Sequence, residues 1–344
     1  KTMKRISILL LAVLSIMTTY AQKEVAAITA GTIAPTTEEV EKAWKFAGRA
    51  GLFANQVALV NWSAGGVSSI SGLLNGDIFA NYRKGKHSWE NNFKAEYGLI
   101  KEKSADLKKN ADRMELNSKY GYQIDKKGTL FVGALMSFNT QFTMGYTAGE
   151  VRHSSNFLSP GNLVLAAGLD WKPSDMFSLF FSPVAGKLVF VTDKGVDETT
   201  YGLNAGAQVR TELGAYVKVE FKKDLMKNVK FKTALTLYTN YLDTTTTAVY
   251  ENDLFFKRKS NFGNIDVDWS VGIDLTVNKW ITVNLGTQLI YDHNTKINLF
   301  DKEGNTIMSS DGSQKTGART QFKEALNVGV NYRFKPKEKK EVKK

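Results

Sequence analysis

The sequence predicts an all-β fold, an antiparallel transmembrane β-barrel of about 12 strands with a short N-terminal helix or lead. Three observations predict it. Long segments alternate apolar and polar residues, the connections between them are short and long in turn, and the first residues have the pattern of an export signal. A repeat of two is that of a β-strand, and bacterial membrane barrels join their strands by short periplasmic turns and longer outer loops.

The chain begins with the three parts of a secretory signal peptide, which we expect to cover residues 1–21. Lys1, Lys4 and Arg5 supply the positive charges, residues 6–17 are apolar, and small-residue cleavage chemistry ends at Ala21. A helical anchor is the alternative, but the apolar run is short for a bilayer-spanning helix. We therefore expect export to the outer membrane of a Gram-negative bacterium.

Composition excludes several classes of protein. The chain has no cysteine, which removes disulfides, thiolate metal sites and lipid attachment of the bacterial lipoprotein type. The net charge is +12, but three of these charges lie in the signal peptide and four in the tail at residues 335–344, which leaves +5 for residues 22–334. Without a basic stripe interleaved with aromatic residues, we expect no nucleic-acid partner.

The mature chain divides into three parts. Residues 22–50 form an N-terminal periplasmic lead, in which acids early and aromatic residues late predict a short helix from Pro35 to Phe46. Residues 51–334 form the barrel, and residues 335–344 form a basic tail with six lysines. The tail is a solvated run or a contact for an acidic partner.

The alternation is clearest between Ile265 and Val277, where all seven odd positions are apolar and none of the even positions is. The segments at residues 281–291 and 321–334 alternate similarly. A soluble sandwich would alternate too. However, segments of about 9 to 13 residues fit a tilted membrane strand better than a globular one, and aromatic residues near their ends are typical of barrel girdles.

Ten connections support the strand count. The short ones are residues 83–86, 125–128, 172–175, 222–228 and 278–279, and the long ones are residues 101–110, 143–161, 192–200, 244–263 and 292–320. With a tight turn at residues 63–66, these give about 12 strands and place both ends on the periplasmic side. Ten or 14 strands also fit, because the first strand and residues 177–191, interrupted by Pro183, are weakly patterned.

The polar face of the predicted strands supplies the candidate site. We expect the following residues to line the lumen: Lys94, Glu96, Lys218, Glu220, Lys230, Lys232, Asp266, Asp268, Asp274, Asn284, Lys323 and Arg333. We interpret them as a mixed-charge lumen with stiffening ion pairs, and a cation-attracting carboxylate patch is the alternative. Neighbouring inward residues are about 6.6 Å apart, too far for one metal ion to bridge, so we expect no metal site.

No pattern of catalytic residues accompanies this lumen. The chain has three histidines, His87, His153 and His293, which we place in turns and loops. Ser88 follows His87 directly, and adjacent strand residues face opposite ways. The sequence has neither a GxSxG elbow nor a nucleotide-binding fingerprint. We therefore expect no catalytic residues and no cofactor, and the protein is not expected to be an enzyme.

One stretch resembles a known family. Residues 44–66 read WKFAGRAGLFANQVALVNWSAGG, and residues 88–98 read SWENNFKAEYG. The signature residues Asn61, Trp62, Gly65 and Gly66, with the later Trp89-Glu90-Asn91-Asn92, resemble the Bacteroidota outer-membrane barrel family known as domain of unknown function 3078. The resemblance implies an outer-membrane barrel and carries over no catalytic residues. Read physically, the glycine pair suits a tight strand reversal.

The leading hypothesis from the sequence is a passive, porin-like pore for small polar solutes. The alternative is a closed structural barrel whose loops or basic tail engage partners, and an outer-membrane hydrolase is less favoured. In each case we expect outer-membrane lipid and the barrel-assembly machinery as partners. Side-chain parity does not distinguish an open lumen from a closed one.

Overall fold

The computed structural model describes residues 43–58, 68–103, 105–146, 153–242, 244–250, 253–259, 263–278, 280–301, 306–309 and 314–334. For residues 244–250, 253–259, 333 and 334 it describes the backbone only. The predicted signal peptide, the lead as far as residue 42, the signature residues Asn61, Trp62, Gly65 and Gly66, and the basic tail lie outside these ranges.

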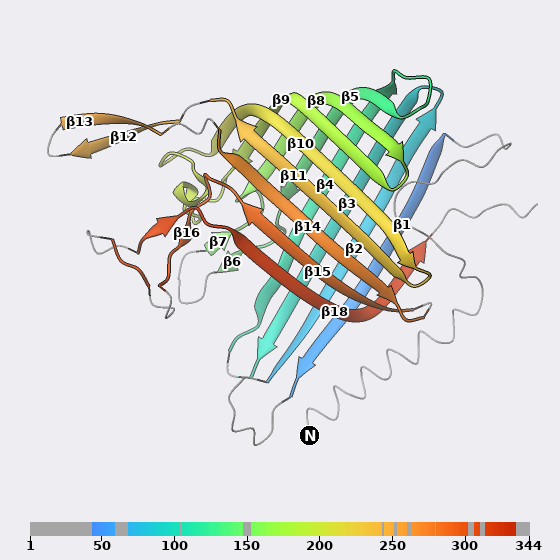
Figure 1. Ribbon diagram of the computed structural model, residues 1–344. Coiled ribbons are helices and arrows are strands. Elements are labelled where there is room, and N and C mark those ends of the chain that lie inside the picture. Colours follow the sequence, from blue (N-terminus) through green and yellow to red (C-terminus); the bar gives the residue numbers. More distant parts are fainter. Residues whose placement is uncertain are drawn as a thin grey trace, which may run out of the picture. The chain divides into compact units, whose positions relative to one another are not determined.

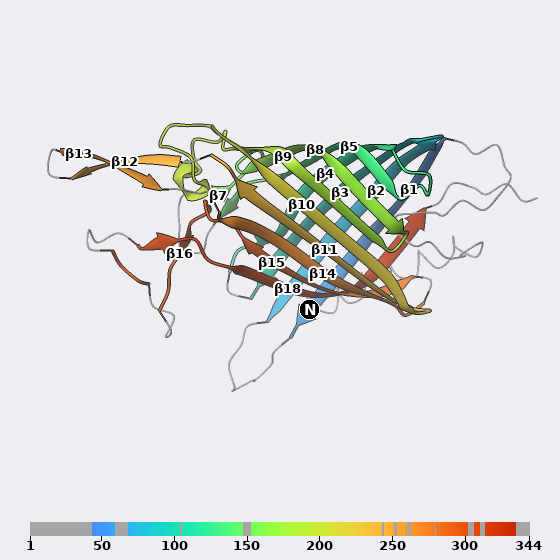
Figure 2. The same ribbon diagram turned by 45° about the horizontal axis from the view of Figure 1, so that its top comes forward.

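Twelve antiparallel strands form a closed barrel (Figures 1 and 2). They are β1 (Trp44–Val57), β2 (Ser69–Lys84), β3 (His87–Glu102), β4 (Lys108–Gln123), β5 (Leu130–Thr140), β8 (Gly161–Ser174), β9 (Phe177–Phe190), β10 (Val209–Met226), β11 (Val229–Asn240), β14 (Ile265–Thr276), β15 (Ile281–Tyr291) and β18 (Gln321–Phe334). Each pairs with the next in this order, and β18 pairs with β1. The predicted antiparallel barrel of 12 strands is confirmed.

The predicted alternation of short and long connections holds except between β3 and β4, where the connection expected at residues 101–110 comprises only residues 103–107. The turns after β2, β4, β8, β10 and β14 are short. The long connections contain the remaining elements: β6 (Gly145–Tyr146), β7 (His153–Ser155), the 3₁₀ helix η1 (Glu198–Tyr201), β12 (Thr244–Tyr250), β13 (Asp253–Lys259), β16 (Ile297–Asn298) and β17 (Thr316–Gly317). Figure 1 shows these small elements gathered at one end of the barrel. Among the described residues, no helix is long and apolar enough to cross a bilayer.

The barrel begins earlier than the sequence indicated. Residues Trp44 to Phe46, which we expected at the end of a short helix, are the first residues of β1. The prediction was wrong here because cross-strand aromatic packing outweighs the local helix pattern. Trp44 pairs with Tyr82 of β2, and its ring lies 5.3 Å from that of Tyr82 and 5.6 Å from that of Trp89 on β3.

Strand β9 contains a β-bulge that explains its weak sequence pattern. Its register shifts around Pro183 against both neighbours, β8 and β10. Before the bulge Phe180 is buried and Phe181 is exposed, whereas after it Val184 is exposed and Ala185 is buried. The extra residue therefore reverses which parity faces inward. The Ser182 hydroxyl donates to the carbonyls of Ala167 and Val184, both at 2.7 Å, which satisfies backbone groups beside the bulge.

The seam between β1 and β18 is packed tightly on its inner side. Phe53 of β1 is buried and lies opposite Gly329 of β18. A Cβ atom at Gly329 would lie 2.5 Å from a ring carbon of Phe53 and too close to the Leu52 carbonyl. Gly286 on the neighbouring β15 has no atom within 4 Å of such a Cβ. Only the first glycine is therefore required by close packing.

We predict that Gly329→Val destabilises the barrel by about 2 kcal/mol, within the usual range for overpacking, because the new side chain forces the seam apart. The measurement is the free energy of unfolding in urea, followed by the heat-modifiable mobility of the folded barrel in electrophoresis. Gly286→Val is the matched control and should be neutral, since valine favours strands. Equal effects of the two substitutions would contradict the packing argument.

The turn between β4 and β5 is organised by Asp125. Its carboxylate accepts hydrogen bonds from the Thr129 and Leu130 amides at 3.0 Å and from the Thr129 hydroxyl at 2.8 Å. Desolvation raises the pKa of Asp125, but these hydrogen bonds outweigh it and lower the pKa to about 2. The ionised carboxylate therefore stabilises the turn.

We predict that Asp125→Asn lowers the thermal unfolding midpoint at pH 7 and has little effect near pH 2. Because the pKa of Asp125 is lowered on folding, its contribution is complete above the ordinary aspartate range and is lost as the pH falls toward 2. Thermal scans between pH 2 and pH 7 measure this, with the exposed loop residue Asp106 changed to asparagine as control. A pH-independent difference between wild type and Asp125→Asn would refute it.

Candidate functional site in the barrel interior

The barrel carries apolar side chains outside and charged side chains inside. On β14, Trp269 is exposed on the outer face, while the neighbouring Asp268 accepts a hydrogen bond from Gln288 of β15 at 2.9 Å. Leu74 and Leu326, on β2 and β18, are 58% and 59% exposed. The same alternation on successive strands surrounds the interior with polar groups, and this interior is the candidate site.

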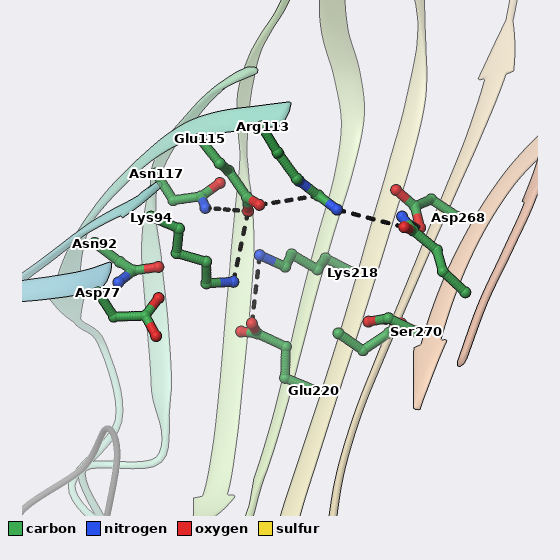
Figure 3. A network of polar contacts seen from close by, with 12 residues as sticks. Asp77, Asn92, Lys94, Arg113, Glu115, Asn117, Lys218, Glu220, Asp268 and Ser270 are labelled. Atoms are coloured by element: carbon green, nitrogen blue, oxygen red, sulfur yellow. Dashed lines mark hydrogen bonds and ion pairs between the residues drawn. The ribbon is translucent and has the colours of Figure 1, made fainter. Parts of the chain in front are cut away.

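Glu115 of β4 is the centre of an interior polar cluster (Figure 3). Its carboxylate lies 2.9 Å from an Arg113 guanidinium nitrogen and 3.7 Å from Lys94 Nζ, and it accepts a hydrogen bond from Asn117 at 2.6 Å. Figure 3 shows Lys218 of β10 extending toward the same carboxylate from another part of the wall. Lys218 also pairs with Glu220 at 3.3 Å. Cations from three strands thus converge on this cluster.

Some contacts join strands that are not neighbours, so they cross the interior. Arg113 of β4 donates to Gln288 of β15 at 3.5 Å, and four strands separate these two on the shorter path around the barrel. Lys172 of β8 pairs with Glu90 of β3. Arg49 of β1 lies 3.8 Å from Asp274 of β14. The contact between Arg113 and Gln288 spans the lumen, and all three contacts narrow the interior.

Accessible space nevertheless surrounds several inward side chains of the lumen. The inward side chains of Lys94, Arg113, Glu220 and Lys232 are between 41% and 47% exposed, although all four belong to barrel strands. Surfaces this large on inward groups indicate a wet central lumen and not a dry core. Opposite charges lie close together there, so the lumen has no single sign of charge.

Toward the end with the long connections, the interior contains a buried ionic cluster around Lys187 of β9. Lys187 Nζ lies 2.8 Å from Asp266 and 3.0 Å from Asp292, and 5.3 Å from the centre of the Tyr238 ring. Glu212, which is 2% exposed, pairs with Arg210. Three carboxylates thus share two cations. Burial raises the pKa of Asp292, but the charges of Lys187 and Arg210 lower it by more, so the pKa lies below its ordinary value.

The connections after β5, β9 and β15 pack on one another above this cluster, and we call their described residues 153–160, 191–208 and 292–301 the loop cover. The Thr200 carbonyl accepts from the Lys296 amide at 2.8 Å, and the Tyr201 hydroxyl donates to the Ser154 carbonyl at 2.7 Å. Burial raises the pKa of Tyr201 to about 12. Val191, Val196 and Leu203 form a small apolar core with Val189 of β9. The cover is therefore a packed structure.

The structure brings most of the sequence-derived candidates into contact with one another or with other charged groups. Lys94, Lys218 and Glu220 belong to the central cluster, and Glu96 lies opposite Arg113 in the register. Lys232 and Asn284 both contact Asp274, at 3.1 and 2.6 Å. Lys230 pairs with Asp224 at 3.5 Å. Lys323 lies opposite Gln288, and the side chain of Arg333 lies outside the described residues.

Sequence reasoning missed the cluster around Lys187. The bulge at Pro183 changes the inward parity before Lys187, so no single alternation through β9 could place it. Arg210 and Glu212 could have been found, because they continue the inward parity of Lys218 and Glu220 toward the start of β10. Within the described residues, no group of three or more His, Asp or Glu is arranged to hold a metal ion.

Comparisons with known proteins give a family match and several fold neighbours. The family model described as "Protein of unknown function (DUF3078)" matches residues 54–146. Among curated proteins, no sequence matches the chain. An outer membrane channel from Pseudomonas putida F1 is 9% identical, with 88% of this chain and 100% of that chain covered and a TM-score of 0.38.

Two further solved structures are similar at the same level. The translocator domain of the autotransporter NalP from Neisseria meningitidis is 10% identical, with 86% of this chain and 90% of that chain covered and a TM-score of 0.33. The NanC porin is 7% identical, with 83% and 98% covered and a TM-score of 0.35.

We predict that Lys187→Met loosens the loop cover, because it leaves Asp266 and Asp292 without the lysine that they share. Breaking a buried ion pair from one side typically costs about 3 kcal/mol or more. Amide hydrogen exchange of residues 191–208 should therefore become at least about tenfold faster. Lys218→Met, which removes an interior cation outside this cluster, is the matched control. Unchanged exchange in Lys187→Met would show that the cover is held by other contacts.

Proposed function

We propose that the protein is a barrel of the outer membrane of a Gram-negative bacterium and that it forms a narrow passive pore for small polar solutes. Export by the signal peptide at residues 1–21, insertion by the barrel-assembly machinery and origin in Bacteroidota belong to the same proposal. The single observation that carries the pore is the wet, charged central lumen inside a barrel with an apolar exterior.

The exterior supports the membrane location. Large apolar side chains such as Leu74, Leu326 and Phe322 are more than half exposed and lie on strands spread over the barrel. Soluble proteins rarely leave apolar surface of this extent uncovered. A bilayer covers it, and the strands of 11 to 18 residues have the length that a tilted membrane strand requires.

The interior supports a pore for small polar solutes. Twelve strands enclose more space than the eight that side chains alone can fill, and less than the 16 to 18 of wide aqueous porins. Cross-lumen contacts such as that of Arg113 with Gln288 narrow the remaining space. Both signs of charge line it, so small polar molecules and ions of either sign find partners there.

A closed barrel with a structural or binding role is the second candidate, and the loop cover favours it. If the Lys187 cluster and the loop cover block that end of the barrel, solutes cannot pass through the lumen. The loops are then the interacting surface. The two candidates differ in one measurable property, which is conductance.

We also propose that the protein is not an enzyme. His87 contacts the Tyr120 hydroxyl at 2.6 Å, His153 contacts Met144 at 3.1 Å, and His293 contacts Tyr291 at 3.4 Å. Within the described residues, none of the contacts found for these histidines is to a serine hydroxyl. These partners support loop and turn roles over a serine–histidine hydrolase.

The experiment is single-channel recording of the refolded mature protein in a planar bilayer under a salt gradient. We predict small conductance steps. Their reversal potential should indicate greater selectivity for anions in Asp268→Asn and for cations in Lys218→Met, because each change removes one charge of the opposite sign from the lumen. Thr287→Val, on the outer face of β15, is the control and should change nothing. Silence from a folded, heat-modifiable barrel would refute the pore and favour the closed barrel.

A further inference from the structure

The end of the barrel with the short turns carries an unusual charge. Seven exposed cations lie on three turns or at the strand ends beside them, and we call them the basic rim: Arg83, Lys84, Lys86, Lys126, Lys127, Lys223 and Lys227. The turns that carry them follow β2, β4 and β10. Among the described residues, none of the seven makes an ion pair. They are therefore available to an external anion.

The acids of these turns do not neutralise the rim. The carboxylate of Asp125, between β4 and β5, is occupied by the hydrogen bonds of its own turn. Asp224, near the end of β10, lies 3.5 Å from Lys230 of β11 and so pairs with a cation outside the rim. The three turns thus keep a positive surface.

Aromatic side chains lie next to the rim on five strands of the barrel. Trp44, Tyr82 and Trp89 pack together on β1, β2 and β3, and Trp171 of β8 lies 5.7 Å from Phe177 of β9. These residues lie within a few positions of the short turns. Rings with a polar edge favour the headgroup depth of a bilayer.

Apolar residues also lie among the rim cations themselves. Ile124 precedes Lys126, while Leu225 and Met226 lie between Lys223 and Lys227, and all three apolar side chains are more than half exposed. An acidic polysaccharide would gain nothing from these side chains. A lipid headgroup region, with phosphate beside acyl chain, matches the mixture of cations and apolar groups.

We propose that the basic rim binds the phosphate headgroups of anionic phospholipids in the leaflet at the short-turn end. This inference rests on the membrane location proposed above and not on the pore. The cations lie beyond the aromatic ring, at the level of the phosphates, and they attract phosphatidylglycerol in preference to a zwitterionic lipid.

The experiment measures which lipids surround the barrel. The full mature protein is reconstituted in vesicles of brominated phosphatidylglycerol with plain phosphatidylcholine, and in the reverse pair. Bromine quenches tryptophan fluorescence on contact, and Trp44, Trp89 and Trp171 lie in the ring beside the rim. The wild type should select phosphatidylglycerol about fivefold, and 0.5 M salt should remove most of this selection.

Two quadruple variants test the residues. Lys126→Gln with Lys127→Gln, Lys223→Gln and Lys227→Gln should lose most of the selection. The control changes four exposed lysines of the long connections or strand ends near them, Lys101, Lys103, Lys108 and Lys194, to glutamine and keeps the same net charge. It should retain the wild-type selection.

Four outcomes would overturn the proposal. Equal quenching by both lipids in the wild type would show that the rim selects no lipid, and the membrane location would stand. Selection lost equally in both variants would assign it to net charge and not to the rim. Quenching by neither lipid would overturn the membrane location and the rim together. Rim-dependent binding of a soluble acidic polysaccharide, without lipid selection, would identify a different partner.

Discussion

The hydrogen bonds between β1 and β18 are the interaction on which the rest of this barrel depends. Every other pair in the barrel joins strands close in sequence, whereas this pair joins residues from Gly48 to Phe53 with residues from Gly329 to Phe334. An open sheet would expose two rows of unpaired backbone groups, which neither a lipid environment nor a monomeric protein tolerates. Closure also forms the interior lumen. The charged residues are enclosed only because β1 and β18 pair along the seam.

Enclosure makes the interior charges depend on one another. A charge with reduced access to water needs a partner, and removal of one member leaves the other at a high cost. The central cluster around Glu115 includes the partly exposed side chain of Arg113, whereas the cluster around Lys187 is buried beneath packed loops. In the proposed pore, control over passage therefore belongs to the loops and Lys187, because the central side chains are already accessible.

Much of the fold followed from the sequence, because a strand with one apolar and one polar face has alternating apolar and polar residues. The segment from Ile265 to Val277 shows this, since its apolar parity is the outward parity of β14. The start of β1 did not follow, because Trp44 is placed by rings on two other strands. The central candidates followed from parity alone. The partners across the lumen, such as Gln288 for Arg113, depend on barrel closure, which no local pattern encodes.

The bulge at Pro183 shifts by one residue the alternation of inward and outward side chains along β9. Two residues apart within either half of β9, side chains share a face, but across Pro183 the rule shifts by one position. In the half next to the short turn, the even-numbered side chains face inward. In the half next to the loop cover, the odd-numbered side chains face inward. Lys187 faces the interior only because the bulge precedes it. Any relative that lacks the extra residue must compensate elsewhere in the strand, or its lysine faces lipid and its neighbour Leu188 faces water.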